Sequence, residues 1–237
     1  MTFKSVFTCA LFLGAAVGAQ AAPLATALTN SNVDLTGTFV YALTANPGAA
    51  NTTVGNATFT NVFSTAGVSV SHQNYIQDWH DSAAANSAGL SAVMRSIIWS
   101  YGNANAEVVK LSMSNLQVGA TYKAQLLFGE DCCDRGFDIF QNGVKVANDF
   151  SPYYLTDGEY NGAAIWADTF VATSTSVVFG LGFFGGRQDF NPILNAATLE
   201  QMPSTNAVPE PGSLPLLLVG LGAVGLWARR KQAQPAV

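Results

Sequence analysis

The sequence has little cysteine, histidine and charge, and these scarcities exclude several classes of protein. Its 237 residues include three cysteines and two histidines, and 11% of them are charged. The histidines do not have the spacing of zinc ligands on one helix face. With a formal net charge of −5, the chain offers no basic face to nucleic acid. We therefore expect neither a zinc site nor a nucleic-acid partner.

Signatures of catalysis are lacking as well. The Gly-x-Ser-x-Gly turn that presents a nucleophilic serine is absent from the sequence. The glycines of residues 180–186 lie within or just after a strand-like run, so they do not open a helix that could cradle phosphate. The sequence also marks no pair of carboxylates as the two acids of a glycosidase. We therefore expect that this protein is not an enzyme.

Apolar runs mark the two ends of the chain. Lys4 is followed by an apolar run over residues 6–17 and by the small-residue site Ala19-Gln20-Ala21, a pattern typical of a secretory signal peptide. Cleavage after Ala21 removes residues 1–21 and leaves an exported chain that begins at Ala22. Cys9 is lost with the signal peptide.

The C-terminal end has three parts. Residues 204–212 form a linker, residues 213–228 are uncharged, and Arg229-Arg230-Lys231 follow. The uncharged run would be about 24 Å long as a helix, which is short for a bilayer core of about 30 Å but sufficient where the membrane is thin. Basic residues favour the cytoplasmic side, so the chain upstream is expected outside the membrane. We thus expect a single hydrophobic helix with a basic end at residues 213–231.

The triplet Pro209-Glu210-Pro211, the hydrophobic segment and the basic end resemble the PEP-CTERM sorting tail of exopolysaccharide-producing Gram-negative bacteria. The resemblance implies that an exosortase, a membrane protease, cuts near the triplet. The inner membrane would then hold the chain only transiently, before the protein reaches the cell surface or the extracellular space. The alternative is an ordinary tail anchor behind a proline-rich stalk.

Residues 22–203 are long enough for one domain. Strand-like runs bounded by Gly, Asn, Asp or Pro recur through them. They cover residues 35–42, 57–63, 67–72, 108–113, 121–128, 137–141, 145–150, 164–171, 176–183 and 193–200. Residues 88–99 have helical periodicity, and Asn142-Gly143 predicts a type I′ hairpin. Close spacing of the strands favours an all-β, antiparallel sandwich with one short helix.

Three segments in the second half, residues 122–130, 136–143 and 191–196, resemble a malectin-type, galactose-binding-like domain. The shared pattern is a strand ending in Phe-x-Glu, a hairpin containing Phe-Asp and Asn-Gly, and a final Asn-Pro strand. The resemblance implies a jelly-roll sandwich that binds carbohydrate.

The same resemblance implies binding residues. Asp189 is nearest to the aspartate that precedes Asn-Pro in the family, with Phe190 inserted before Asn191. The loop that carries an aromatic pair in malectin has no aromatic residue here. Tyr153 and Tyr154 are candidates to replace that pair, because aromatic faces take the C–H surface of sugars while polar groups bind their hydroxyls. Tyr160, Trp79 and Phe184 are further aromatic candidates. The alternative is that each of these residues only packs or turns the chain.

Cys132 and Cys133 are the cysteines left after signal cleavage, and an exported protein meets an oxidising compartment. One hypothesis is a vicinal disulfide between them, although adjacent Cα atoms, about 3.8 Å apart, are closer than is usual for a disulfide. Intermolecular bridges and free thiols are the alternatives.

Glu130, Asp131, Asp134 and Asp138 lie in the same nine residues. Carboxylate oxygens bind Ca²⁺, so these four residues are candidate ligands, although their spacing matches no EF-hand. The alternative is a solvated acidic turn balanced by Arg135. No other cofactor is suggested by the sequence.

These observations predict an exported module that binds carbohydrate and associates with extracellular polysaccharide. The alternative is a structural protein of the cell surface or matrix, without a sugar site. Exposed aromatic side chains beside Asp189 would favour the first function.

If the tail alone anchors the chain, deleting the chain from Val208 onward is predicted to abolish membrane association during export. Fractionation of producing cells tests this, with the full chain as control. If the truncated protein still sediments with membranes, the tail is not the sole anchor.

Overall fold

The computed structural model describes residues 22–29, 32–79, 87–103, 106–183, 186–187 and 189–203. The expected signal peptide, the linker with Pro209, Glu210 and Pro211, and the hydrophobic segment at 213–231 lie outside these ranges. Within them, no helix has the length and apolar character needed to cross a membrane.

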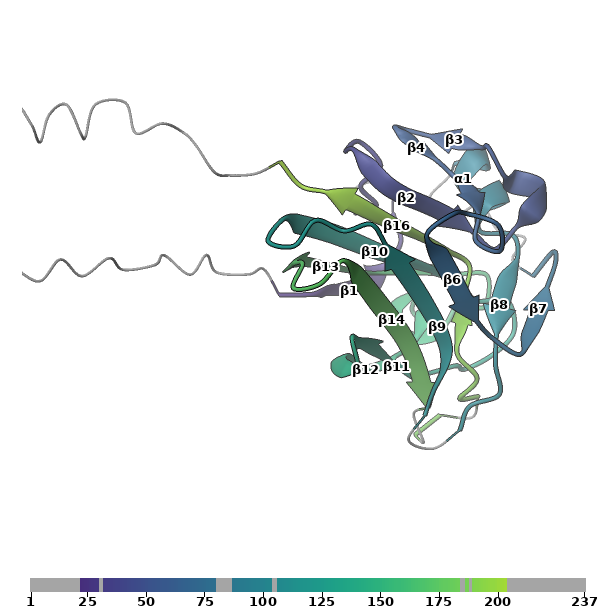
Figure 1. Cartoon of the computed structure of the whole chain (residues 1–237). Helices are drawn as coiled ribbons and strands as arrows, with labels where there is room; N and C mark the ends of the chain where they lie inside the picture. Colours follow the sequence, from purple (N-terminus) through teal and green to yellow (C-terminus); the bar gives the residue numbers. More distant parts are fainter. Residues whose placement is uncertain are drawn as a thin grey trace, which may run out of the picture. The chain divides into compact units, whose positions relative to one another are not determined.

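Two sheets make up most of the domain (Figure 1). In spatial order the larger contains β1 (Leu24–Ala27), β13 (Ala163–Val171), β10 (Thr121–Gly129), β16 (Ala196–Gln201), β2 (Phe39–Thr44) and β5 (Thr60–Asn61). The smaller contains β12 (Val144–Phe150), β11 (Phe137–Gln141), β14 (Ser176–Phe183), β9 (Glu107–Ser114) and β6 (Val68–Ser71). Neighbouring strands are antiparallel except β2 and β5.

Shorter elements complete the domain. A three-stranded sheet contains β15 (Ile193–Leu194), β8 (Ile97–Trp99) and β7 (Asn74–Ile76), and β3 (Thr53–Val54) pairs with β4 (Ala57–Thr58). The helical elements are α1 (Ala88–Val93), α2 (Pro152–Leu155) and the short 3₁₀ helix η1 (Pro47–Ala49).

The main core lies between the two large sheets. Alternate residues of β14, namely Val177, Phe179 and Leu181, are buried and meet apolar side chains of β10 and β13. Trp166 of β13 is fully buried, and its ring packs edge-on against Phe179 at a centroid distance of 5.7 Å. Period-two alternation with one face in the core is what a sandwich requires. The expected all-β sandwich is confirmed.

The larger sheet is also covered on its other face. Leu127 of β10 and Ile165 of β13 pack there in a second cluster with Leu90 and Val93 of α1. Ser87 caps α1, because its hydroxyl accepts the backbone N–H of Leu90. Burial on both faces explains why residues 124–130 are all buried instead of alternating.

Two local expectations had different outcomes. The Asn142-Gly143 hairpin is confirmed, since φ is 50° and 78° at these residues. The helix expected at residues 88–99 is wrong in its second half, because α1 ends at Val93 and residues 97–99 form β8 between β7 and β15. Two β-branched isoleucines at 97 and 98 favour a strand once partners are available on both sides.

Strand β10 connects opposite ends of the sandwich. Gln201, the last residue of β16, is paired with Tyr122 near the start of β10, whereas Gly129 ends β10 beside Ala163. Seven residues of strand separate Tyr122 from Gly129, which corresponds to about 23 Å. The loop after Gly129 is therefore at the opposite end from the point where the described chain leaves β16 (Figure 1).

We predict that Phe128→Ala lowers the free energy of unfolding by about 3–5 kcal/mol. Phe128 is fully buried, and its ring lies 4.7 Å and 5.4 Å from those of Phe150 and Phe137. Val144→Ala is the matched control, because Val144 is 66% exposed, and it should change stability by less than about 0.5 kcal/mol. Urea unfolding measures both; equal effects would contradict the assigned core.

Candidate functional site

Three loop segments meet at the end of the sandwich where β10 stops. They are residues 130–136 after β10, residues 151–160 after β12, and residues 189–191 before β15. The backbone N–H of Asp189 donates to the Asp134 carbonyl at 3.1 Å, and Gly136 N–H donates to the Asp189 carbonyl at 3.0 Å. The Tyr154 hydroxyl donates to the Asp134 carboxylate at 3.2 Å. The fold thus brings Asp189 and Tyr154, which the sequence predicted separately, to either side of Asp134.

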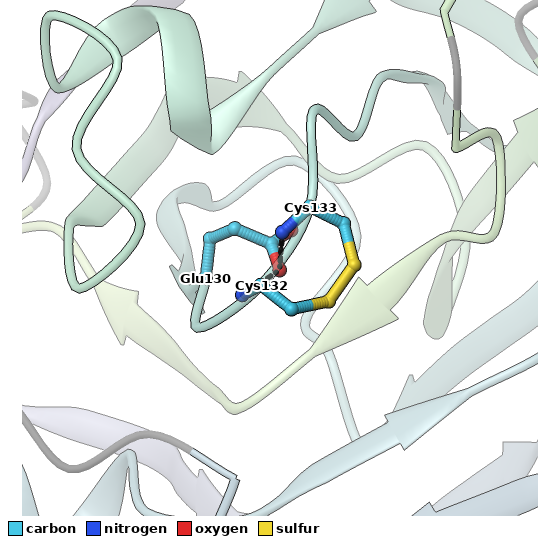
Figure 2. A group of neighbouring side chains, drawn as sticks. All are labelled: Glu130, Cys132 and Cys133. Carbon is cyan, nitrogen blue, oxygen red and sulfur yellow. Dashed lines mark hydrogen bonds between the residues drawn. A yellow bond between two sulfur atoms is a disulfide. The ribbon is translucent and has the colours of Figure 1, made fainter.

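A buried carboxylate holds the first loop. Glu130 is fully buried, and its Oε1 accepts the backbone N–H of Asp131 at 3.1 Å. The same oxygen accepts the backbone N–H groups of Cys132 and Cys133, each at 3.3 Å (Figure 2). Its Oε2 accepts from Arg135 Nε at 2.8 Å. Successive N–H groups that converge on one anion form a concave nest. The loop is therefore folded around the Glu130 side chain.

Arg135 connects this nest to Asp189. Its guanidinium, on a residue that is 4% exposed, lies 3.1 Å from Asp189 Oδ2 and 5.7 Å from the centroid of the Trp79 ring. The Trp79 indole N–H donates to the Gly129 carbonyl at 2.9 Å. We call Glu130, Arg135 and Asp189 the ionic clamp. Within it the Asp189 carboxylate is engaged by a protein partner, so this residue positions the loops.

The environment of Glu130 acts on its pKa in two directions. Burial raises the pKa, while the Arg135 charge and the backbone N–H groups lower it, and the raised value prevails. A buried carboxylate is stable as a charged group only while its donors stay in place. The charge of Glu130 thus depends on the conformation of the Cys132 and Cys133 backbone.

The sulfur atoms of Cys132 and Cys133 are bonded to each other (Figure 2). Cys132 is exposed and Cys133 is half-buried, so the ring lies at the surface above Glu130. Among the described residues, the two cysteines and Glu130 are the one group of three potential metal ligands that lie close together. Both sulfurs are occupied by their mutual bond, and Glu130 by its donors, so this group does not fit a metal in the disulfide form.

The four acidic candidates for calcium have separate surroundings. Glu130 binds the nest and Arg135, Asp134 accepts from Tyr154, and Asp138 accepts the Asp149 N–H at 3.0 Å and pairs with Lys145. Their carboxylates, with that of Asp131, do not form one close group within the described ranges. This arrangement does not support a four-carboxylate Ca²⁺ site, and calcium binding stays a prediction.

Three tyrosines, the half-buried Tyr153 and the exposed Tyr154 and Tyr160, form a surface group that we call the tyrosine patch. Ser151 accepts the Tyr154 N–H and caps α2, which carries the first two rings. Tyr153 lies 4.8 Å from Tyr160 and 5.2 Å from Tyr154, between ring centroids. Tyr154 and Tyr160 are 52% and 47% exposed. The hydrogen bond that the Tyr153 hydroxyl donates to Tyr160 raises the pKa of Tyr153, so its phenol is neutral at physiological pH.

Polar side chains border this patch. The guanidinium of Arg187 lies 4.0 Å from the centroid of the Tyr154 ring, and its Nε donates to Asp149 at 2.7 Å. The bond to Asp149 raises the pKa of Arg187, which stays charged. A solvent-open hollow of about 160 Å³ is lined here by Asp149, Tyr154, Arg187 and neighbouring residues. Aromatic faces and fixed charges are therefore adjacent.

The remaining candidates face another group. Phe190 is 37% exposed and packs on Phe183 at 4.9 Å between ring centroids, and Asn191 accepts the Gly102 N–H at 2.9 Å. No contact joins either side chain to the tyrosine patch among the described residues. Of the other aromatics named from the sequence, Phe184 lies outside the described ranges. The sequence analysis named Arg135 only as the counter-charge of a solvated acidic turn and missed its buried contacts with Glu130 and Asp189. It did not single out Arg187, for which the available signal was an arginine shortly before Asp189.

We predict that Arg135→Ala lowers the free energy of unfolding by about 3–5 kcal/mol, because it leaves Glu130 buried without its counter-charge. Arg95→Ala is the matched control. Arg95 pairs with Asp78 at 2.6 Å, but both side chains are about half exposed, and such pairs contribute about 0–1 kcal/mol. Urea unfolding of the two variants provides the comparison. Equal small losses would show that the ionic clamp does not hold the loops.

Comparison with known proteins agrees with both resemblances. Residues 207–232 match the PEP-CTERM protein-sorting motif. None of the curated proteins matches the chain. Among solved structures, a chain in the crystal structure of the plant peptide RALF23 in complex with FER and LLG2 is similar to this protein. The TM-score is 0.52 at 13% identity, over 75% of this protein and 55% of the matched chain.

The structures of two plant receptor-like kinases, ANX2 and FER, are also similar to this chain. ANX2 gives a TM-score of 0.51 over 70% of this chain and 49% of its own, and FER gives 0.50 over 70% and 50%, each at 13% identity. The chain thus spans about half the length of these structures, and at this identity the likeness concerns the fold alone. The expected fold is confirmed: the chain joins a malectin-like β-sandwich to a PEP-CTERM sorting motif and is an exported protein.

Proposed function

We propose that this exported protein binds carbohydrate at the tyrosine patch and associates with extracellular polysaccharide. The observation that carries the proposal is the grouping of Tyr153, Tyr154 and Tyr160 beside Arg187 and Asp149. Soluble proteins seldom gather exposed aromatic rings without an interaction to serve.

The chemistry of the patch suits a sugar. A pyranose has an apolar C–H face and an edge of hydroxyl groups, which match an aromatic face bordered by fixed polar groups. Arg187 is held by Asp149, so its remaining N–H groups need little ordering when a ligand binds. Asp134 adds a carboxylate that can accept from a hydroxyl group in exchange for the Tyr154 hydroxyl.

We extend the proposal to the ends of the chain. Residues 1–21 are a cleaved signal peptide, residues 22–203 are the binding domain, and residues 204–231 are the linker and sorting segment. Exosortase-type cleavage near Pro209, Glu210 and Pro211 would free the domain from the inner membrane. The binding domain would then act at the cell surface or beyond it.

One observation favours the structural alternative. Phe63 and Tyr75, 41% and 36% exposed, pack edge-on at 5.7 Å beside His72, and they belong to the region of β5, β6 and β7. An aromatic surface of this kind suits contact with another protein. A matrix protein without a sugar site would use this surface instead of the tyrosine patch.

We predict that the exported protein binds a polysaccharide saturably in a glycan and exopolysaccharide screen. Replacing both rings, Tyr153→Ala with Tyr154→Ala, should weaken binding at least about tenfold, or about 1.4 kcal/mol. Tyr75→Ala is the matched control, because it removes an exposed ring that is not part of the tyrosine patch.

The same screen is run with Ca²⁺ and with a chelator. Loss of binding in chelator would support calcium ligands among Glu130, Asp131, Asp134 and Asp138. If no glycan binds in either condition, the carbohydrate proposal fails and the structural alternative gains support. If Tyr75→Ala weakens binding as much as the double variant, the site has been misplaced.

A further inference from the structure

The disulfide between Cys132 and Cys133 is not needed for the proposed binding chemistry, yet it lies where it can influence that chemistry. Both cysteines donate their backbone N–H to Glu130 Oε1, so the ring and the nest are parts of one short loop (Figure 2). The next residue, Asp134, accepts from the Tyr154 hydroxyl. One turn of chain thus joins the disulfide to the tyrosine patch.

Closing a ring over the Cys132–Cys133 peptide restricts the backbone torsions on both sides of it. The N–H groups of the nest are then ordered before they meet Glu130, and the loop loses little further entropy in holding them. After reduction, the same N–H groups can turn to water. Glu130 would stay buried with fewer donors, which weakens its pairing with Arg135 and the hold on Asp189.

The two cysteines differ in exposure. Cys132 is exposed and Cys133 is half-buried. We assign Sγ of Cys132, on the more exposed residue, as the atom that a thiolate from solvent attacks, with Sγ of Cys133 as the leaving group.

We propose that the Cys132–Cys133 disulfide is a thiol–disulfide exchange site for dithiol reductants, and that its oxidation state controls the ligand affinity of the tyrosine patch through the ionic clamp. The effect on affinity rests on the proposed carbohydrate function, whereas the effect on the loop does not.

The exchange is a two-step thiol–disulfide reaction. One thiolate of the dithiol attacks Sγ of Cys132, a mixed disulfide forms, the Cys132–Cys133 bond breaks, and Cys133 leaves as a thiolate. The second thiolate of the reductant then attacks the other reductant sulfur, which is bonded to Cys132 in the mixed disulfide, and Cys132 leaves as a thiolate. The dithiol becomes a cyclic disulfide after giving two electrons, and the two cysteine thiolates take up protons according to their pKa values.

Dithiothreitol serves as the dithiol in the test, applied to the exported protein. Alkylation followed by intact-mass measurement should add two groups after reduction and none before. Trp79 reports on the loop, because its indole donates to Gly129 and its ring lies against Arg135. Reduction should change the tryptophan fluorescence of the wild type. The change should be absent from Trp79→Phe and from the double variant Cys132→Ser with Cys133→Ser.

In the binding arm, reduction should weaken the affinity for the glycan found in the screen by at least about fivefold. The double serine variant should bind with the weaker affinity whether or not the reductant is present. Reversal of the loss by an oxidising disulfide would exclude damage to the protein.

Two results would overturn the proposal. One is the presence of two alkylatable thiols in the native exported protein. The other is full reduction by mass without a change in Trp79 fluorescence or in ligand affinity. A fluorescence change in a protein that binds no glycan would support the coupling of disulfide and loop, and would reject the carbohydrate function separately.

Discussion

The buried ion pair between Glu130 and Arg135 is the interaction on which the loop end of this sandwich depends. Glu130 is placed by the last residues of β10, a strand buried on both faces and therefore rigid. Arg135 reaches Glu130 and Asp189 at once, and so connects two loops that are 54 residues apart in sequence. Such a pair gives little net stability compared with an apolar core, but it is costly to break. Its role here is to hold the loop of Glu130 and the loop of Asp189 in one arrangement relative to each other.

The tyrosine patch depends on that arrangement without belonging to it. Asp134 follows the cysteine pair and receives the Tyr154 hydroxyl, while Arg187 lies over the Tyr154 ring and pairs with Asp149. The Tyr154 ring therefore has two polar neighbours, and one of them, Arg187, is held by Asp149. A surface of this kind can bind a ligand at low entropic cost, because the protein side is already ordered.

Much of the fold could be predicted from the sequence, and less of the site. Alternation in β14 and the Asn142-Gly143 turn depend on local chemistry, and both were predictable. The end of α1 was not, because Ile97 and Ile98 fit a helix by period and become a strand only through partners from residues 74–76 and 193–194. The sequence could nominate Asp189 and Tyr154 as candidates, but the inward pairing of Asp189 with Arg135 depends on contacts between distant loops. Phe190 and Asn191 follow Asp189 directly, yet their side chains belong to another group, since a non-strand turn sends neighbours in different directions.

The antiparallel pair of β10 and β16 determines how the domain would respond to mechanical tension. Strand β10 leads into the loop of residues 130–136, and β16 leads out of the domain toward the sorting segment. A force that pulls on this loop against the C-terminal end of β16 would draw the two strands past each other. The hydrogen bonds between them run across the strands. The six paired positions from Tyr122 with Gln201 to Leu127 with Ala196 would then resist shear together instead of opening one after another. A tethered domain with this connectivity is suited to stay folded under drag.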